Sequence, residues 1–218
     1  MKSLLKLATV LMLFFASTFL VVQATGVITP GKIETWLETA KNISPLYVMG
    51  IVVGLLFADL FIAVPTLTIT IFAGYFLGHT QGAIAVFAGM LLAATTGYAV
   101  SYRYGPFVLR RIISDEKKSL EVKETFDQHG FTTILLARAL PILPEVTACL
   151  AGITRMRFLR FFTAWSIGTI PYVLIATYEV PISSIKAPNP AIFTAIGITT
   201  VLWLAWLILQ TKKKRATI

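Results

Sequence analysis

Three ionisable residues stand inside apolar stretches of this sequence, where their presence calls for a chemical role. Asp59 lies in the run "FADLFIAVPTLT", and Arg138 and Glu145 lie in "RALPILPEVTACLAG". An ionised side chain at the centre of a bilayer costs at least about 2.5 kcal/mol, so each is expected to face a partner or a wet cavity. These residues are therefore the main candidates for a functional site.

The three residue types suggest different tasks. A guanidinium group is always charged and binds phosphate through two parallel hydrogen bonds, so Arg138 is expected to bind an anionic head group. Asp59 and Glu145 are expected to carry protons or to tune the charge of the site, since carboxyl groups in apolar surroundings can exchange protons near neutral pH. In the alternative interpretation, Arg138 pairs with one carboxylate only to neutralise buried charge.

A second basic cluster follows the Arg138 segment. Arg155 and Arg157, with Arg160 beside them, could bind anionic lipid and steer it toward Arg138, or could simply anchor the topology. The net charge of +9 does not indicate nucleic acid binding, because no fold for reading bases is present. The motifs HExxH, GxSxG and GxxxxGK[ST] and any His/Cys cluster are missing, so we expect no enzyme activity, no metal and no cofactor.

The elements that position these residues follow from hydropathy. The chain has 218 residues, of which 56% are hydrophobic and 13% charged, and its mean hydropathy is +0.80. These values exclude an ordinary soluble domain and predict an all-α integral membrane protein. The expected order is an N-terminal membrane helix or signal peptide (1–25), an interfacial amphipathic segment (26–45), a core (46–180), and a C-terminal transmembrane helix with a basic tail (181–218).

Two segments of the core are expected to break within the membrane. Residues 46–78 are too long for one straight span, and residues 131–152 carry prolines in their middle. A proline removes a helical hydrogen bond, and broken backbone at membrane depth survives only beside protein or a wet cavity. The residues expected at the breaks are Pro65 and Gly74 in the first segment and Pro141, Pro144 and Gly152 in the second.

The distribution of basic residues favours two re-entrant hairpins. If both broken segments crossed the bilayer, the basic stretch 103–130 would lie outside, against the positive-inside rule. If each segment enters and leaves on one side, fifteen basic residues are cytoplasmic, including those of the C-terminal tail, and three are outside. With the spans 82–102 and 158–178 and the two terminal helices, this gives about four transmembrane helices. The two hairpin-and-span units then form an inverted repeat, as in secondary transporters.

The sequence resembles the DedA family, also called the VTT-domain or SNARE-associated membrane proteins, and within it the Golgi Tvp-type branch and its bacterial homologues. The resemblance covers roughly residues 44–180. It rests on "SPLYVMGIVVGLLFADLFIAVPTLTITIFAGYFLGHTQG", on "GYAVSYRYG" and above all on "ARALPILPEVTACLAGITRMRFLRFFTAWSIGTIPYVLIATY". It implies two membrane-embedded hairpins and the movement of lipid between leaflets, with Arg138 matching the arginine of the family's second hairpin motif.

The combined expectation is a multi-pass transporter or scramblase for an anionic phospholipid or a polyprenyl phosphate. Coupling to H⁺ or Na⁺ and assembly as a homo-oligomer are left open. The expected location is a bacterial or archaeal plasma membrane, with the C-terminus in the cytoplasm. Two alternatives stay open: a secondary transporter for a small ion or solute, and a membrane scaffold for trafficking or envelope maintenance that transports nothing.

Overall fold

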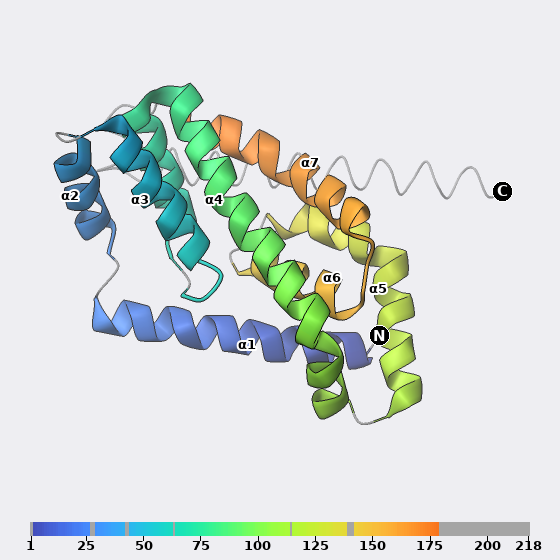
Figure 1. The fold of residues 1–218 in the computed structure, drawn as a ribbon. Helices are drawn as coiled ribbons and strands as arrows, with labels where there is room; N and C mark the ends of the chain where they lie inside the picture. The colour runs from blue at the N-terminus through green and yellow to red at the C-terminus, as the bar shows by residue number, and fades with distance from the viewer. Residues whose placement is uncertain are drawn as a thin grey trace.

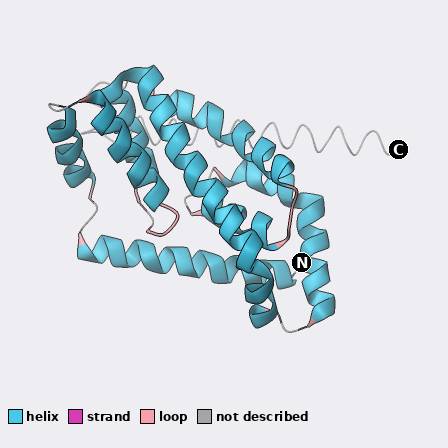
Figure 2. Ribbon diagram, viewed as in Figure 1, coloured by secondary structure: helices cyan, strands magenta, loops and turns pink. Residues whose placement is uncertain are grey.

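The computed structural model describes residues 2–26, 29–41, 44–62, 64–113, 115–138 and 142–178. Within these ranges the regular elements are all helices, and no strand occurs (Figure 2). The all-helical class expected from hydropathy is therefore confirmed. The helices are α1 (Lys2–Thr25), α2 (Pro30–Lys41), α3 (Pro45–Ala58), α4 (Thr66–Ile112), α5 (Glu116–Ala137), α6 (Leu143–Ile153) and α7 (Phe158–Ala176).

The first core segment is a helix–turn–helix unit. Ser44 caps α3 by accepting a hydrogen bond from the Leu46 N–H at 3.2 Å, and Pro45 fits the first helical turn because no partner for its nitrogen is needed there. The chain turns after Ala58 and begins α4 at Thr66, so that α3 and the first part of α4 lie side by side (Figure 1). We call α3 with residues 66–77 the first helix pair.

A second break divides α4 at Gly78. Its φ of +76° and ψ of 164° are not helical, so α4 consists of a short arm, 66–77, and a long helix, 79–112. Glycine adopts this conformation without a steric penalty, which explains the residue at this position. The long helix continues ten residues beyond the predicted span 82–102. Hydropathy predicts only the part of a helix that lies in lipid, whereas the helix itself can extend into water.

The second core segment forms another helix pair, α5 with α6. Helix α5 ends at Ala137 and α6 begins at Leu143, with Arg138 and Ile142 on either side of the break. Helix α6 has 11 residues and packs against both α4 and α5. At 1.5 Å per residue it is about 16 Å long, roughly half the thickness of the hydrocarbon layer.

The breaks do not fall at the glycines named from the sequence. Gly74 lies inside the short arm of α4 and Gly152 lies inside α6. Both glycines mark close helix contacts: a side chain at Gly74 would collide with the backbone of Thr177, and one at Gly152 with the backbone of Tyr98. Their small size permits close helix packing, as is common between membrane helices.

In the part of the chain that the structure describes, two helical segments are long and apolar enough to cross a membrane: Thr66–Gly105, which includes the kink at Gly78, and Phe158–Ala176. Large apolar side chains point outward from both, including Ile84 on α4, which is 58% exposed, and Leu174 on α7, which is 46% exposed. Apolar surface of this extent is expected to face lipid. The predicted C-terminal span, within 181–218, lies outside the described residues.

The two N-terminal helices flank this core. Helix α1 packs against α5 and α6, while α2 packs against α3 and α4 (Figure 1). The amphipathic pattern predicted for 26–45 does form a helix, and its apolar residues Ile33 and Leu37 are fully buried. Trp36 remains 40% exposed. Helix α2 therefore covers the first helix pair, and its contact with a membrane interface stays a prediction.

Candidate functional site

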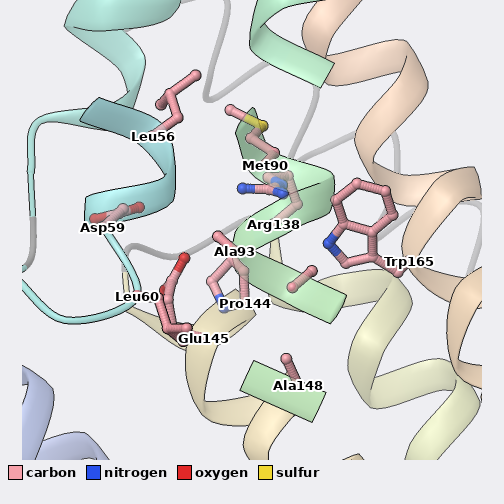
Figure 3. Close-up of a pocket in the computed structure, with 11 residues that line it drawn as sticks. Leu56, Asp59, Leu60, Met90, Ala93, Arg138, Pro144, Glu145, Ala148 and Trp165 are labelled. Carbon is pink, nitrogen blue, oxygen red and sulfur yellow. The ribbon is translucent and has the colours of Figure 1, made fainter. Parts of the chain in front are cut away.

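The turns of the two helix pairs meet at a small cavity. Asp59 from the first turn, Arg138 from the second and Glu145 from the start of α6 line the same space (Figure 3). Met90, Ala93 and Ala94 of α4 and Trp165 of α7 complete much of the wall. The cavity measures about 20 Å³, which accommodates one ordered water molecule and is far too small for a phosphate head group.

Asp59 organises the first turn. One carboxylate oxygen accepts a hydrogen bond from the Val64 N–H at 2.9 Å, and the other accepts one from the Thr66 hydroxyl at 2.8 Å. The residue is 8% exposed, so both bonds form in a largely dry environment. They tie the segment that leads into α4 to the residue that ends α3. Asp59 thus has a structural role in addition to any role in charge coupling.

Arg138 has neutral partners. Its guanidinium donates a hydrogen bond to the Thr169 hydroxyl at 3.1 Å and lies 5.3 Å from the centre of the Tyr172 ring, a cation–π contact. Both partners are on α7, so this helix sets the position of the charge. Among the residues that the structure describes, Arg138 forms no ion pair with Asp59 or Glu145. The direct charge pair considered from the sequence is therefore not formed in this conformation.

Glu145 lies in the first turn of α6, two residues after the helix begins. Unpaired N–H groups give this end of a helix a partial positive charge, which favours a carboxylate. In contrast to Asp59, the Glu145 side chain forms no hydrogen bond with another residue in the described part of the chain. Its carboxyl group is therefore the less constrained of the two acids at the cavity.

The backbone next to the cavity is strained. Ile142, the residue before α6, has a φ of +71°. A β-branched residue rarely adopts this left-handed conformation, which costs of order 1 to 3 kcal/mol. Pro144 follows within the first turn of α6, and Pro65 directly precedes α4. These two prolines therefore adjoin breaks, as predicted, and Pro141 lies outside the described residues.

The other predicted basic residues lie elsewhere. Arg155 and Arg157 follow the C-terminal end of α6, whereas the cavity adjoins its N-terminal end, about 16 Å away along the axis. In the described ranges no cluster of three His, Cys, Asp or Glu residues could hold a metal ion. The sequence did not identify Thr169 or Tyr172, because only the packing of α7 brings them to Arg138.

Most of the residues around the cavity lie in a stretch of sequence that matches a known domain family. The family model of the VTT domain matches residues 64–180, from the end of the first turn to the end of α7, which is more than half of the chain. The chain belongs to the DedA family. No curated protein and no solved structure shows significant similarity to it.

Membership of the DedA family identifies the chain as a membrane protein. The matched region contains Arg138, Glu145 and the α7 residues that contact Arg138, while Asp59 lies five residues before its start. The match does not distinguish the branches of the family, so the Golgi Tvp-type branch stays a prediction.

Proposed function

We propose that this DedA protein transports an anionic lipid between the two leaflets and that Arg138 binds the lipid phosphate. The observation that carries this proposal is that the positively charged Arg138 side chain has no carboxylate partner among the described residues. The side chain is half-buried, it faces the cavity, and its partners in the described structure are a hydroxyl and an aromatic ring. A guanidinium with donors unused by carboxylates can bind a phosphate in the bidentate geometry that it favours.

The lengths of the helices support a re-entrant arrangement. Helix α3 has 14 residues and α6 has 11, so they extend about 21 Å and 16 Å, less than the roughly 30 Å of hydrocarbon. The turns between the paired helices line one cavity, which two hairpins entering from opposite leaflets would also place at mid-membrane depth. The proposal includes the inverted repeat and a cytoplasmic C-terminus.

The volume of the cavity implies that transport requires opening. At about 20 Å³ the site is closed around Arg138. A lipid head group could enter only if one helix pair moved away from the other, alternately toward each leaflet. Two non-helical residues adjoin the helices that would move: Ile142 lies at the start of α6, and Gly78 lies at the end of the short arm of α4. Glu145 is the group proposed to exchange a proton during this cycle.

The same volume favours a second candidate, transport of a small ion or solute, which would need less opening. The non-transporting scaffold has less support, because in the described structure the buried charges are not used to hold the helix pairs together by an ion pair. Transport assays distinguish all three.

The deciding experiment measures lipid flipping in proteoliposomes. Purified protein is reconstituted with a fluorescent anionic phospholipid, and the fraction reduced by external dithionite reports movement between leaflets. We expect Arg138→Ala to slow flipping at least about tenfold, since a hydrogen bond to a charged group contributes about 1.5 to 3 kcal/mol. Arg138→Lys should be intermediate, because lysine cannot bind in a bidentate manner.

Arg111→Ala is the matched control, since Arg111 is an exposed arginine at the far end of α4. Equal flipping by wild-type and folded Arg138→Ala protein would refute the role assigned to Arg138. Uptake of a labelled ion without lipid movement would favour the second candidate.

A further inference from the structure

A second, wider site lies at the opposite end of α6 from the cavity. It is an open groove of about 600 Å³ between α5 and the connection from α6 to α7. Four basic residues line it, Lys123, Arg155, Arg157 and Arg160, together with the acidic residues Glu124 and Asp127. We call this the basic groove. It is large enough for a phosphorylated head group, which the cavity is not.

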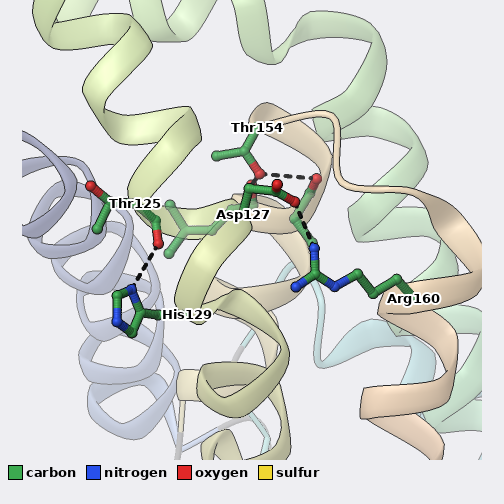
Figure 4. A network of polar contacts seen from close by, with 7 residues as sticks. Thr125, Asp127, His129, Thr154 and Arg160 are labelled. Atoms are coloured by element: carbon green, nitrogen blue, oxygen red, sulfur yellow. Dashed lines mark hydrogen bonds and ion pairs between the residues drawn. The ribbon is translucent and has the colours of Figure 1, made fainter. Parts of the chain in front are cut away.

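The acidic residues do not neutralise the basic groove. Asp127 binds Arg160, with 2.6 Å between the carboxylate oxygen and the guanidinium nitrogen (Figure 4). Within the described residues, Lys123, Arg155 and Arg157 form no ion pair. Three cations thus face the groove with one remaining carboxylate, that of Glu124, which is itself exposed.

Arg155 occupies a backbone position that usually belongs to glycine. Its φ is +59°, its N–H bonds the Gly152 carbonyl at 3.0 Å, and the Met156 N–H bonds the Ala151 carbonyl at 3.0 Å. This pair of bonds is the Schellman motif, in which a left-handed residue ends a helix and glycine avoids the steric cost. An arginine in this conformation costs about 1 to 2 kcal/mol. Such strain points to a use for the side chain.

The end of α6 is anchored to α4, which positions the Arg155 side chain before a ligand arrives. The Tyr98 hydroxyl donates to the Met156 carbonyl at 2.6 Å, and the Arg155 guanidinium lies 4.9 Å from the centre of the Tyr102 ring. Both tyrosines are on α4, and their rings are stacked 5.8 Å apart. Helix α4 therefore fixes both the backbone turn and the guanidinium that follows it.

The start of α7 adds a partial positive charge to the basic groove. Arg157 is the residue before α7, and its side chain forms no cap hydrogen bond. The first N–H groups of this 19-residue helix therefore lack acceptors from its cap, and they favour an anion next to Arg157 and Arg160. The basic side chains and the helix start together make a site for a group with several acceptor oxygens.

We propose that the basic groove binds a dianionic phosphate group, as found in a phosphomonoester lipid head group or in free inorganic phosphate. The groove lies about 16 Å from the Arg138 cavity along α6, roughly the distance from mid-membrane to the edge of the hydrocarbon layer. It is thus a surface site, separate from the site of transport. Phosphate binding there does not require that the protein transports lipid.

The experiment uses a double variant that removes two positive charges and replaces each arginine with a residue that suits its backbone position, which offsets the loss of the Arg155–Tyr102 contact. Arg155→Gly places glycine where the Schellman motif prefers it, and Arg157→Ser places a preferred capping residue before α7. The full-length protein is embedded in nanodiscs of phosphatidylcholine and titrated calorimetrically with dihexanoyl phosphatidic acid, inorganic phosphate or dihexanoyl phosphatidylcholine. Wild type is expected to bind the first two ligands and not the third.

We expect the double variant to bind phosphatidic acid at least about tenfold more weakly, with an unchanged or higher Tm. Arg111→Ala, which removes one positive charge outside the groove, should bind as wild type does. Stronger binding of phosphatidic acid than of phosphate identifies a lipid head group as the source, and equal binding identifies free phosphate. If the double variant unfolds, Arg157→Ser alone provides the test.

Undiminished binding by the folded variant, or equal binding of phosphatidylcholine and phosphatidic acid, would overturn the proposal. Arg138→Ala separates this result from the transport hypothesis, since it should slow flipping at least about tenfold and leave phosphate binding at the basic groove intact.

Discussion

At the residue scale, the two acids at the cavity have different surroundings. Both oxygens of Asp59 accept hydrogen bonds that hold the first turn together. Glu145 faces the same cavity, and its side chain makes no such bond with the described residues. Sequence position alone made the two carboxylates equivalent candidates for charge coupling. Their contacts distinguish their roles. Asp59 is the better candidate for a structural role, and Glu145 is the better candidate for proton exchange.

The structural role of Asp59 predicts different stabilities for two substitutions. Asp59→Ala leaves the buried Val64 N–H without its partner and the Thr66 hydroxyl with only the Val64 carbonyl at 3.3 Å, which should lower the free energy of unfolding by about 1 to 3 kcal/mol. Asp59→Asn keeps an acceptor for Val64 and should cost less than about 1 kcal/mol. Thermal unfolding in detergent measures both. Equal Tm values for the two variants would contradict this role.

The proposed proton exchange at Glu145 predicts a change in coupling. Wild-type flipping should respond to a pH gradient imposed across proteoliposomes, and Glu145→Gln should flip lipid at a rate independent of the gradient. Asp59→Asn is the matched control and should keep the response. If the Glu145→Gln variant still responds to the gradient, or if only Asp59→Asn loses the response, Glu145 is not the residue that couples flipping to protons.

At the element scale, the helix breaks could be predicted from the sequence more accurately than the contacts between helices. Prolines and buried charges are local signals, so the interruptions near Pro65 and before Pro144 could be predicted. The first broken segment was expected to end at residue 78, which is where the kink in α4 lies, although glycine alone does not show that its φ is positive. The contacts of Arg138 with Thr169 and Tyr172 depend on how α7 packs against the second turn, which no local pattern encodes.

Gly152 shows how an element can be misread from sequence. It was expected at a break, yet it lies in α6 where this helix passes closest to α4. A methyl group there would meet the Tyr98 carbonyl and the backbone of Tyr102, so the two helices would have to separate. Glycine in an apolar segment can mark either a kink or a close approach, and only the packing distinguishes them.

This close approach predicts that Gly152→Ala lowers the free energy of unfolding by about 1 to 3 kcal/mol through overpacking. Gly54→Ala is the matched control, since Gly54 is also helical and has no atom within 4 Å of an added methyl group. It should be neutral or raise the stability by up to about 1 kcal/mol, because alanine favours helix. Tm measurements in detergent compare them, and equal effects would exclude a close α4–α6 contact.

At the scale of the whole molecule, α6 relates the two proposed sites. Its N-terminal end adjoins the closed cavity and its C-terminal end leads into the basic groove. The helix is about 16 Å long, so its two ends lie at different depths if it stands across the membrane as proposed. If the groove is at the cytoplasmic surface, the cavity is near mid-membrane and the second helix pair enters and leaves on one side. The transport proposal therefore depends on topology, as does the depth assigned to the basic groove, whereas phosphate binding at the groove does not.

Topology is tested by labelling single cysteines in a Cys149→Ser background, in which the buried native cysteine is removed. Probes at Glu38 and Gln81 flank the first helix pair, and probes at Lys118 and Arg157 flank the second; all four positions are exposed. Two re-entrant pairs require that a membrane-impermeant maleimide added to intact cells labels Glu38→Cys and Gln81→Cys and spares the other two variants.

Opening the cells should then expose Lys118→Cys and Arg157→Cys to the same reagent, which shows that these cysteines are reactive. If the first helix pair instead crossed the bilayer, Glu38→Cys and Gln81→Cys would label from opposite sides, because the pair would connect the two surfaces. The turns would then no longer approach mid-membrane from opposite leaflets, and Arg138 would have no alternating path for a head group. Labelling of Lys118→Cys in intact cells would likewise place the basic stretch 103–130 outside, against the positive-inside rule on which this topology rests.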